Sequence, residues 1–256
     1  MTNRDNDRLD FWNSRAALGF CAGTNDFMIK RLEIEAIGGY AQDGMKILDF
    51  GCGNGVTAMA LAKQKAVDLT GLDYAAEMIG QAVVAAEKED LKGSVSFEVA
   101  DHLKLSSLNQ AFDLVYTERC LINLPTWDDQ KKTIADIISL LKPGGRYIMC
   151  ESSRTGLDEI NRLRGMMDLE LISQPWHNLY FVDDLVSGLS MEGCRLAEVN
   201  EFSATYYFLS RVVNAALARA DNREPRYDDR INLMSMHLPV ISSCAQTKIW
   251  VWEKLR

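Results

Sequence analysis

The stretch Lys46-Ile47-Leu48-Asp49-Phe50-Gly51-Cys52-Gly53-Asn54-Gly55 decides the fold of this chain. Its apolar residues predict a buried parallel strand, which breaks into three glycines at alternate positions before a helix-prone run, Val56 to Lys63. Glycine suits places where the backbone takes a positive φ angle or approaches a ligand closely. A strand, a glycine turn and a helix N-terminus together direct backbone N–H groups at one point above a sheet. The stretch therefore predicts a nucleotide-type site, against the simpler alternative of a turn that only connects strand and helix.

The spacing of the glycines indicates which nucleotide to expect. The dinucleotide fingerprint places its third glycine one residue later than this chain does. The pattern D-x-G-x-G-x-G, starting at Asp49, resembles motif I of the class I S-adenosylmethionine-dependent methyltransferases. The resemblance implies that Asp49 lies near the methionine amino group of S-adenosylmethionine. It also implies that Gly51, Cys52 and Gly53 lie against the sulfonium end.

Composition excludes several other classes of protein. With 256 residues, 47% of them hydrophobic and 25% charged, the chain has the make-up of a globular protein with one large α/β domain. A net charge of −8 without a cluster of lysine and arginine argues against nucleic acid as a partner. No apolar run approaches the roughly 20 residues that cross a bilayer, and the polar start is not a signal peptide. Six cysteines without a C-x-x-C pair predict no metal site but free thiols in a reducing compartment, so we expect a cytoplasmic protein.

A second acid follows the next predicted strand, in the order that this family has. Val67 to Asp73 predicts a strand that ends in a carboxylate, and Ala75 to Lys88 predicts a helix. A carboxylate accepts hydrogen bonds from both vicinal ribose hydroxyls, and the resemblance makes Asp73 the ribose ligand. We expect Tyr74 beside it in the cofactor site. Met78 resembles the apolar residue that packs on the adenine.

A third acid follows the strand Val95 to Val99. The resemblance implies that Asp101 accepts from the exocyclic amine of adenine, and that the backbone N–H of His102 completes recognition of the base. A single aspartate after a strand is otherwise most often a turn residue. Its place behind two other matches favours the cofactor role.

The end of the fourth predicted strand, Phe112 to Tyr116, should face the transferable methyl group, because ligands lie at the carboxyl ends of parallel strands. We expect Thr117 to contact the cofactor, and Glu118 and Arg119 to act at the reacting end. The Asn/Asp-Pro-Pro-aromatic tetrad of many amino-methylating relatives is absent, which argues against a DNA base or protein amide as acceptor. A planar cationic fork suits a carboxylate or phosphate, so Arg119 predicts an anionic acceptor. Alternatively, Arg119 pairs with Glu118 or a nearby acid and only holds the loop.

The N-terminal segment predicts two helices that cover the cofactor. A helical pattern breaks at residues 23–26 and resumes after three residues that are good N-caps. Such a segment ahead of motif I resembles the lid of many small-molecule methyltransferases. Trp12, Arg15 and Thr24 are then candidates to close the methionine end of the site. The alternative is that Trp12 belongs to the core and the loop only caps a helix.

The second half of the chain predicts the rest of the sheet. Trp127 to Leu141 forms an amphipathic pattern. The stretch Leu140-Leu141-Lys142-Pro143-Gly144-Gly145-Arg146 is a mark of the resembled family, in which we expect the glycines to end the helix. Strands follow at Tyr147 to Cys150, Cys194 to Asn200 and Thr247 to Trp252, and the resemblance makes the last one antiparallel. We therefore expect an α/β fold with a Rossmann-like, seven-stranded methyltransferase sheet. Its predicted division is one domain of residues 1–256, with a helical lid at 1–40, a cofactor-binding core at 46–150, and substrate-cap insertions at 151–180 and 206–240.

The insertions carry the remaining candidates. His177 lies among polar and aromatic residues, and we expect it at the catalytic site as a proton acceptor, unless it is an ordinary packing histidine. His237 lies in an apolar run and is expected in the core. Arg154 and Arg211 could help Arg119 to hold an anion.

The sequence thus predicts an S-adenosylmethionine-dependent methyltransferase that acts on a small, anionic metabolite or sugar derivative, most simply at oxygen by in-line transfer. The overall pattern resembles bacterial methyltransferases of surface-polysaccharide or natural-product pathways. Three alternatives stay open: N-methylation of a small amine, a Rossmann-like oxidoreductase, and a non-catalytic relative that binds cofactor or a partner subunit. A homodimer is also open, and we expect no contact with a membrane.

Overall fold

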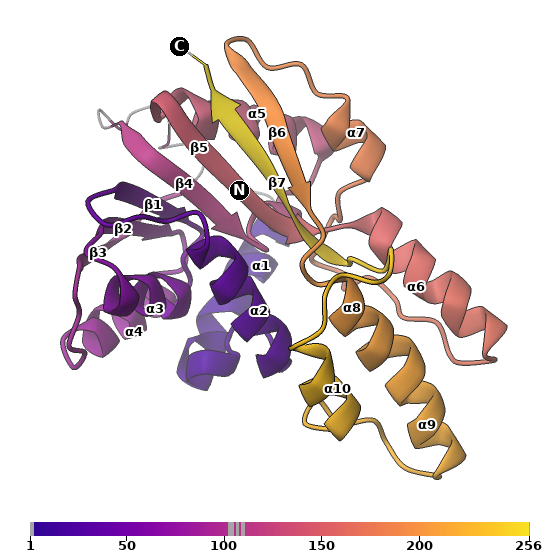
Figure 1. Ribbon diagram of the computed structural model, residues 1–256. Coiled ribbons are helices and arrows are strands. Elements are labelled where there is room, and N and C mark those ends of the chain that lie inside the picture. The colour runs from indigo at the N-terminus through magenta and orange to yellow at the C-terminus, as the bar shows by residue number, and fades with distance from the viewer. Residues whose placement is uncertain (1–2, 102–104, 106–107, 109–110, 256) are drawn as a thin grey trace.

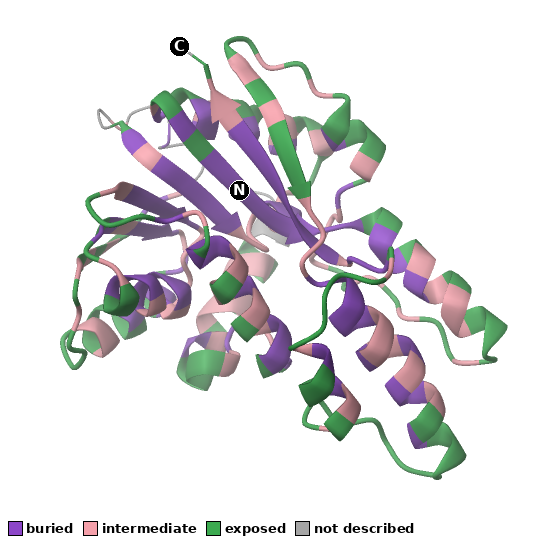
Figure 2. Cartoon of the chain, viewed as in Figure 1, coloured by how far each residue is buried: buried purple, intermediate pink, exposed green. Residues whose placement is uncertain are grey.

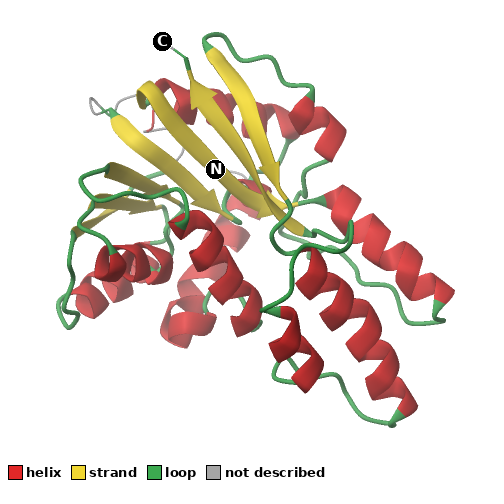
Figure 3. Ribbon diagram, viewed as in Figure 1, coloured by secondary structure: helices red, strands yellow, loops and turns green. Residues whose placement is uncertain are grey.

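The computed structural model describes residues 3–101, 105, 108 and 111–255, and within them a seven-stranded sheet organises the chain (Figures 1 and 3). The strand order is β3-β2-β1-β4-β5-β7-β6. Neighbouring strands from β3 to β5 are parallel, whereas β7 runs antiparallel to both β5 and β6. The predicted sheet with an antiparallel last strand is confirmed. The strands are β1 Lys46–Phe50, β2 Asp68–Asp73, β3 Ser94–Val99, β4 Phe112–Glu118, β5 Leu141–Ser152, β6 Cys194–Asn200 and β7 Thr247–Lys254.

Helices cover both faces of this sheet, because the central strands carry apolar side chains on both sides. On one face, α5 (Trp127–Ser139) and α7 (Asp183–Ser187) pack on a cluster that includes Leu48, Val115 and Trp250. On the other face, α2 (Phe27–Gly38) and α3 (Val56–Gln64) pack against Ile47, Leu114 and neighbouring residues. The helix α4 (Ala76–Ala86) lies against β2 and β3. Figure 2 shows the central strands buried, while the edge strand β6 is largely exposed.

Two N-terminal helices precede the sheet as predicted. The helix α1 (Asn3–Arg15) continues into a 3-10 turn, Ala16–Cys21, and α2 begins after Asp26. The Asp26 carboxylate caps α2 by accepting from the backbone N–H groups of Met28 and Ile29, each at 3.2 Å. This cap explains why the chain restarts a helix directly after the Gly23–Asn25 break.

The structure of the segment at residues 140–146 differs from the prediction. The helix α5 ends at Ser139, and the glycines shape the irregular start of β5 instead of the end of the helix. Gly144 takes a φ of 76°, and a Cβ on Gly145 would lie 2.9 Å from the Lys142 carbonyl oxygen. The pairing of β4 with β5 shifts register here, so the glycines serve a strand bulge.

The two insertions form a separate helical layer beyond the carboxyl end of β5, next to α2 (Figure 1). Its elements are α6 (Arg154–Met166), α8 (Ala204–Tyr207), a π-helical turn (Phe208–Val213), α9 (Asn214–Ala220) and α10 (Arg230–Ser235). Apolar residues of this layer, among them Ile160 and Tyr206, pack on Met28 and Ile29 of α2. The layer therefore fixes α2 against the body of the protein.

Two further features complete the fold. The six cysteines are free thiols, as predicted, although only Cys150 and Cys244 are fully buried. No helix within the described ranges is long and apolar enough to cross a membrane.

Candidate active site

A cavity of about 730 Å³ lies at the carboxyl ends of β1, β2, β4 and β5, under the N-terminal helices. Pockets for small ligands and cofactors occupy about 300–1,000 Å³, and in parallel sheets they lie at this edge. Most of the predicted site residues line the cavity: Trp12, Arg15, Thr24, Asp49, Gly51, Cys52, Gly53, Asp73, Tyr74, Met78, Asp101, Glu118, Arg119 and His177. The structure therefore brings these predicted residues together around one cavity.

The glycine loop forms the floor of the cavity, and its glycines serve different purposes. Gly51, Gly53 and Gly55 all take positive φ angles, of 80°, 54° and 74°. A Cβ on Gly51 would lie 2.2 Å from Cys120 Sγ, so the loop is packed closely there. A Cβ on Gly53 would meet no atom within 4 Å, although this residue lines the cavity. Gly53 thus keeps open a cradle into which a ligand can approach the backbone.

Asp49 lies at the end of β1 with its side chain almost fully buried. Its Oδ2 accepts a hydrogen bond of 2.6 Å from the Tyr116 hydroxyl. Burial raises the pKa of Asp49 to about 8, although this hydrogen bond opposes the change. A cationic group next to Asp49 would favour its charged form, which suits the expected place of the methionine amino group.

Asp73 holds the glycine loop against the start of α4. Its two carboxylate oxygens accept from the backbone N–H groups of Gly53 and Ala75, each at 2.8 Å. These bonds fix the carboxylate at the cavity wall and leave lone pairs for ligand hydroxyls. Asp101 lines the same cavity, as predicted, while His102 lies outside the described residues.

The N-terminal residues form the roof of the cavity. Trp12 packs with Met78 in one apolar cluster, so α1 lies above the predicted adenine side. Arg15 donates to the carbonyl oxygens of Ala22 at 2.5 Å and Cys21 at 2.9 Å. Its guanidinium therefore ties α1 to the loop that follows it, and the lid is a connected unit.

The end of β4 differs from the prediction at Thr117. This residue lines no part of the cavity, and its side chain is fully buried. Its hydroxyl lies 2.9 Å from the Tyr147 hydroxyl of the neighbouring strand. The side chains of a strand alternate between its two faces, so Thr117 points away from the face that Glu118 presents. The predicted cofactor contact of the Thr117 side chain is wrong.

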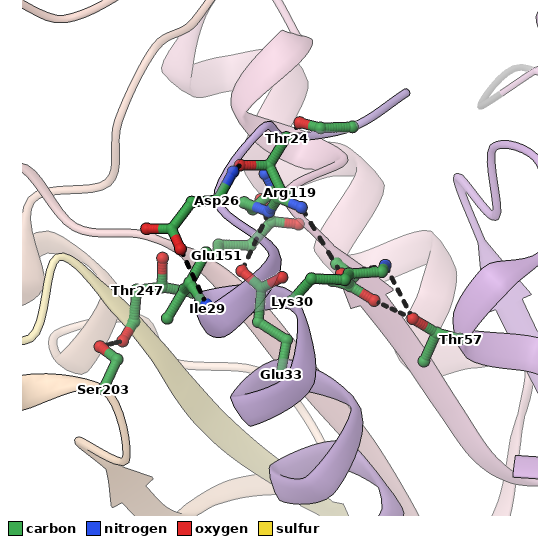
Figure 4. A network of polar contacts seen from close by, with 12 residues as sticks. Thr24, Asp26, Ile29, Lys30, Glu33, Thr57, Arg119, Glu151, Ser203 and Thr247 are labelled. Atoms are coloured by element: carbon green, nitrogen blue, oxygen red, sulfur yellow. Dashed lines mark hydrogen bonds and ion pairs between the residues drawn. The ribbon is translucent and has the colours of Figure 1, made fainter. Parts of the chain in front are cut away.

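Glu118 and Arg119 do reach the cavity, but within a network of charged groups on α2 and α3 (Figure 4). Lys30 Nζ lies 2.5 Å from Glu118 Oε1 and donates to Thr57 Oγ1 at 2.8 Å. The Thr57 hydroxyl in turn donates to Glu118 Oε2 at 2.5 Å. Burial alone would raise the pKa of Glu118, but the charges of Lys30 and Arg119 lower it to about 2. Glu118 is therefore a permanent anion that does not act as a proton acceptor near neutral pH.

Arg119 has partners for its guanidinium on both sides. Its Nε lies 3.0 Å from Glu33 Oε1, its Nη2 lies 3.6 Å from Glu118 Oε1, and its Nη1 donates to the Gly23 carbonyl oxygen at 3.0 Å. Glu33 is completely buried on α2, and burial raises its pKa well above the usual value, against the lowering influence of Arg119. Arg119 also takes a φ of 50°, which is unusual for a residue other than glycine. These contacts match the alternative in which Arg119 pairs with nearby acids and holds the loop.

The two helper arginines lie elsewhere, which corrects the prediction. Arg154 pairs with Asp158 one turn along the exposed face of α6. Arg211 is half-buried, and its Nη2 lies 2.5 Å from Oδ2 of Asp26, the capping residue of α2. Neither lines the cavity, and neither does any other residue of the predicted 206–240 cap. That insertion packs against α2 and does not line the cavity.

The first insertion does reach the cavity, through residues 175–180. This loop is joined to the loop after β4: Leu179 N donates to the Ile122 carbonyl oxygen at 2.6 Å, and Asn178 donates to Asn123 at 3.1 Å. Gln130 of α5 donates to carbonyl oxygens in both loops. The two loops therefore form one continuous wall on the β4–β5 side of the cavity.

Glu151 supports this wall and was missed in the sequence. It is fully buried at the end of β5 and accepts from the backbone N–H groups of Cys120, Leu121 and Ile122, at 3.2, 3.0 and 3.3 Å. Burial raises its pKa to about 7, although these hydrogen bonds oppose the change. A glutamate that ends an apolar strand at the ligand edge of the sheet was the available signal.

His177 lies in this wall, where its ring packs among aromatic side chains. The ring centroid is 4.5 Å from that of Phe11, 5.8 Å from Trp12 and 5.4 Å from Trp176. Its Nδ1 is buried and has no hydrogen-bond partner within the part of the chain that the structure describes. Burial lowers the pKa of His177, and so do the positive charges of Arg8 and Arg15. The imidazole is therefore neutral near neutral pH.

The cavity fits S-adenosylmethionine, because three acids stand in order around an open glycine cradle. Comparison with known proteins indicates the same class of protein, the S-adenosylmethionine-dependent methyltransferases. The family model described as a methyltransferase domain matches residues 41–178, so this chain belongs to the methyltransferase family, within the class I S-adenosylmethionine-dependent enzymes. S-Adenosylmethionine is the cofactor of this class.

Individual relatives are more distant. The sterol 24-C-methyltransferase ERG6B of Gibberella zeae is 30% identical over 63% of this chain and 42% of its own length. An O-methyltransferase of Pyrenophora dematioidea is 30% identical over 56% of this chain and 49% of its own length. The chain thus spans about half, or less, of these curated relatives. Among solved structures, magnesium protoporphyrin IX methyltransferase from Synechocystis PCC 6803 with bound SAH covers 98% of this chain, and 99% of its own, with a TM-score of 0.62 at 17% identity, which supports the fold.

Proposed function

We propose that this protein transfers the methyl group of S-adenosylmethionine to an oxygen atom of a small-molecule acceptor, with His177 as the proton acceptor. The observation that carries the proposal is the position of a neutral imidazole in the wall of the same cavity that holds the glycine cradle and the three acids. His177 is the one histidine that lines the cavity among the described residues. A neutral imidazole can take a proton, whereas Glu118 is held as an anion by Lys30 and Arg119.

The cofactor orientation follows from the order of the strands. Asp101 follows β3 and Asp73 ends β2, so we place adenine and ribose on that side of the sheet. Asp49 ends β1 and would meet the methionine amino group, while Gly51 to Gly53 lie against the sulfonium. Trp12, Arg15 and Thr24 then close the site from above. The acceptor is left with the β4–β5 side, where His177 lies.

The chemistry asked of the protein is mainly alignment. The sulfonium already activates the methyl group, so the site must hold acceptor atom, methyl carbon and sulfur in line. A hydroxyl acceptor loses its proton as the new carbon–oxygen bond forms, and the imidazole of His177 would receive it. An amine acceptor could transfer without such a base, so N-methylation is the second candidate. A non-catalytic role as a cofactor-binding or partner-binding protein is the third.

The anionic acceptor that the sequence predicted has weaker support than the methyl transfer itself. It depended on Arg119, which has carboxylate partners in Glu33 and Glu118, and on two arginines that lie outside the cavity. The names of several relatives support the broader proposal that the acceptor is a small molecule. Besides the sterol and O-methyltransferases, a 27-O-demethylrifamycin SV methyltransferase of Amycolatopsis mediterranei is 34% identical over 41% of this chain. We retain the lid at 1–40 and the cap at 151–180 as proposed functional units of one domain. The homodimer and the cytoplasm stay predictions.

Calorimetry with S-adenosylhomocysteine tests the cofactor site. Asp73→Ala removes the predicted ribose acceptor, and a hydrogen bond to a charged group contributes about 1.5–3 kcal/mol, so affinity should fall roughly ten- to a hundredfold. Asp68→Ala is the matched control, because Asp68 lies exposed at the opposite end of the same strand. Equal affinity of both variants would show that the ribose assignment is wrong. Mass spectrometry of hydroxylated and amine acceptors incubated with S-adenosylmethionine then separates O-methylation from N-methylation and from no turnover.

A further inference from the structure

The part of the cavity left for the acceptor is bounded by the wall that the loops after β4 and β5 form. It carries five residues with apolar side chains, Leu121, Ile122, Leu124, Pro125 and Pro175, and polar residues between them, such as Asn123, Asn178 and Tyr180. Phe11 of α1 lines the cavity opposite and stacks on the His177 ring, with an angle of 34° between their planes. An acceptor that meets these surfaces loses water from most of its own surface.

Polar side chains on this wall are largely committed to each other. The Asn123 amide donates to the carbonyl oxygens of Arg119 and Cys120 and accepts from Asn178. Asp129 accepts from the hydroxyl of Thr126, at the start of α5. These groups hold the wall together, so they offer little compensation to a charged ligand.

Three of the four basic side chains that line the cavity among the described residues have named partners, and the fourth, Arg8, lies near His177, whose pKa its charge helps to lower. Lys30 contacts Glu118 and Thr57, and Arg119 lies between Glu33 and Glu118. Arg15 holds two backbone carbonyl groups of the lid. A carboxylate or phosphate that entered the acceptor side would have to displace one of these partners, rely on Arg8, or remain unpaired. An unpaired charge in a desolvated site is strongly unfavourable.

We propose that the methyl acceptor is an uncharged, predominantly apolar hydroxyl compound, which buries its hydrocarbon part against Phe11 and the β4–β5 wall and presents its hydroxyl group to the imidazole of His177. This inference rests on the proposed function, because it names the acceptor class of the same cavity. Methyl transfer forms the acceptor oxygen–carbon bond and breaks the carbon–sulfur bond, whose electron pair stays on sulfur. The hydroxyl proton passes to the imidazole, and the products are a methyl ether and S-adenosylhomocysteine.

A matched pair of probes tests the class of acceptor. We would titrate 2-naphthol and 2-naphthoate by calorimetry into the full chain saturated with S-adenosylhomocysteine, at neutral pH. The two probes share one ring system and differ in charge. We expect 2-naphthol to bind at least tenfold more tightly. Equal or tighter binding of 2-naphthoate would overturn the proposal, and so would the absence of 2-naphthol binding to a protein that still binds S-adenosylhomocysteine.

Two phenylalanine variants show whether the probe occupies the proposed place. Phe11→Ala should weaken 2-naphthol binding three- to tenfold and leave S-adenosylhomocysteine binding nearly unchanged. Phe27→Ala is the control, because Phe27 lies outside the cavity at the start of α2 and is also partly exposed. Equal effects of the two variants would place the probe elsewhere and refute the assignment. Failure to bind S-adenosylhomocysteine at all would instead refute the proposed function, so the two failures are distinguishable.

Discussion

Replacing Arg119 with methionine separates a structural role of this arginine from a role in substrate binding. The substitution keeps a long side chain but removes a guanidinium that lies between Glu33 and Glu118, whose side chains are only 0% and 6% exposed. Removing one partner of a buried ion pair costs about 3–5 kcal/mol, because the remaining charge is left uncompensated. For a chain of this size that loss corresponds to a melting temperature lower by roughly 6–20 °C.

The loss of stability in Arg119→Met should also depend on pH, and the direction of that dependence follows from the pKa of Glu33. Its pKa in the folded protein is raised above the ordinary value of 4.5, and removal of Arg119 takes away the main influence that lowers it. A group with a raised pKa favours the folded state fully below its unfolded pKa and loses that contribution as pH rises. The difference between wild type and Arg119→Met should therefore be smaller near pH 4.5 than near pH 8, and the part due to Glu118, whose pKa is lowered to about 2, should remain throughout this range.

Urea unfolding at several pH values measures this difference, and calorimetry of S-adenosylhomocysteine gives cofactor affinity on the same samples. We expect stability and cofactor affinity to fall together, since Arg119 and Glu118 both line the cavity. Arg119→Lys keeps the charge and should lose less. A loss of one kcal/mol lowers the melting temperature of a chain of this size by about 2–4 °C. A melting temperature of Arg119→Met within about 2 °C of that of wild type would therefore refute the structural role. Weaker acceptor binding with unchanged stability would restore the anionic-acceptor hypothesis.

Two further predictions concern the cofactor end of the site. Gly53→Ala and Gly44→Ala should each cost about 1–2 kcal/mol of stability, because both glycines have positive φ angles and open space around them. Only Gly53→Ala should lower S-adenosylhomocysteine affinity, roughly tenfold or more as the methyl group enters the cradle; equal affinities would contradict the cradle. Asp49 has a pKa of about 8, so ligand binding near neutral pH should release its proton, and affinity should rise from pH 6 to pH 8 in wild type but not in Asp49→Asn. Calorimetry in two buffers of different ionisation enthalpy detects that proton, and a flat profile in wild type would show that Asp49 meets no cationic group.

The sequence alone determined the sheet and predicted which residues gather at the proposed cofactor half of the cavity. Motif I, Asp73 and Asp101 each follow a predicted strand, and the carboxyl ends of adjacent parallel strands meet at one edge. These features could be read because each depends on a few neighbouring residues: an apolar run, a glycine turn, an acid at the end of a strand. The exception at residues 140–146 is of the same local kind, since one glycine phrase can end a helix or open a strand bulge, and only the pairing of β4 with β5 decided between them.

Only the tertiary structure decided the partners of the charged side chains. Nothing near Arg119 in the sequence shows that Glu33 of α2 would lie 3.0 Å away, or that Arg211 would form an ion pair with Asp26. Glu151 could be read as the end of a strand, but its three backbone donors come from a loop that β4 brings beside it. The sequence shows the sign of a charged side chain and its length. Which residue becomes its partner depends on which helices and strands pack together. The packing of α2 between the sheet and the second insertion therefore determined that the predicted anion site is a buried ion-pair network.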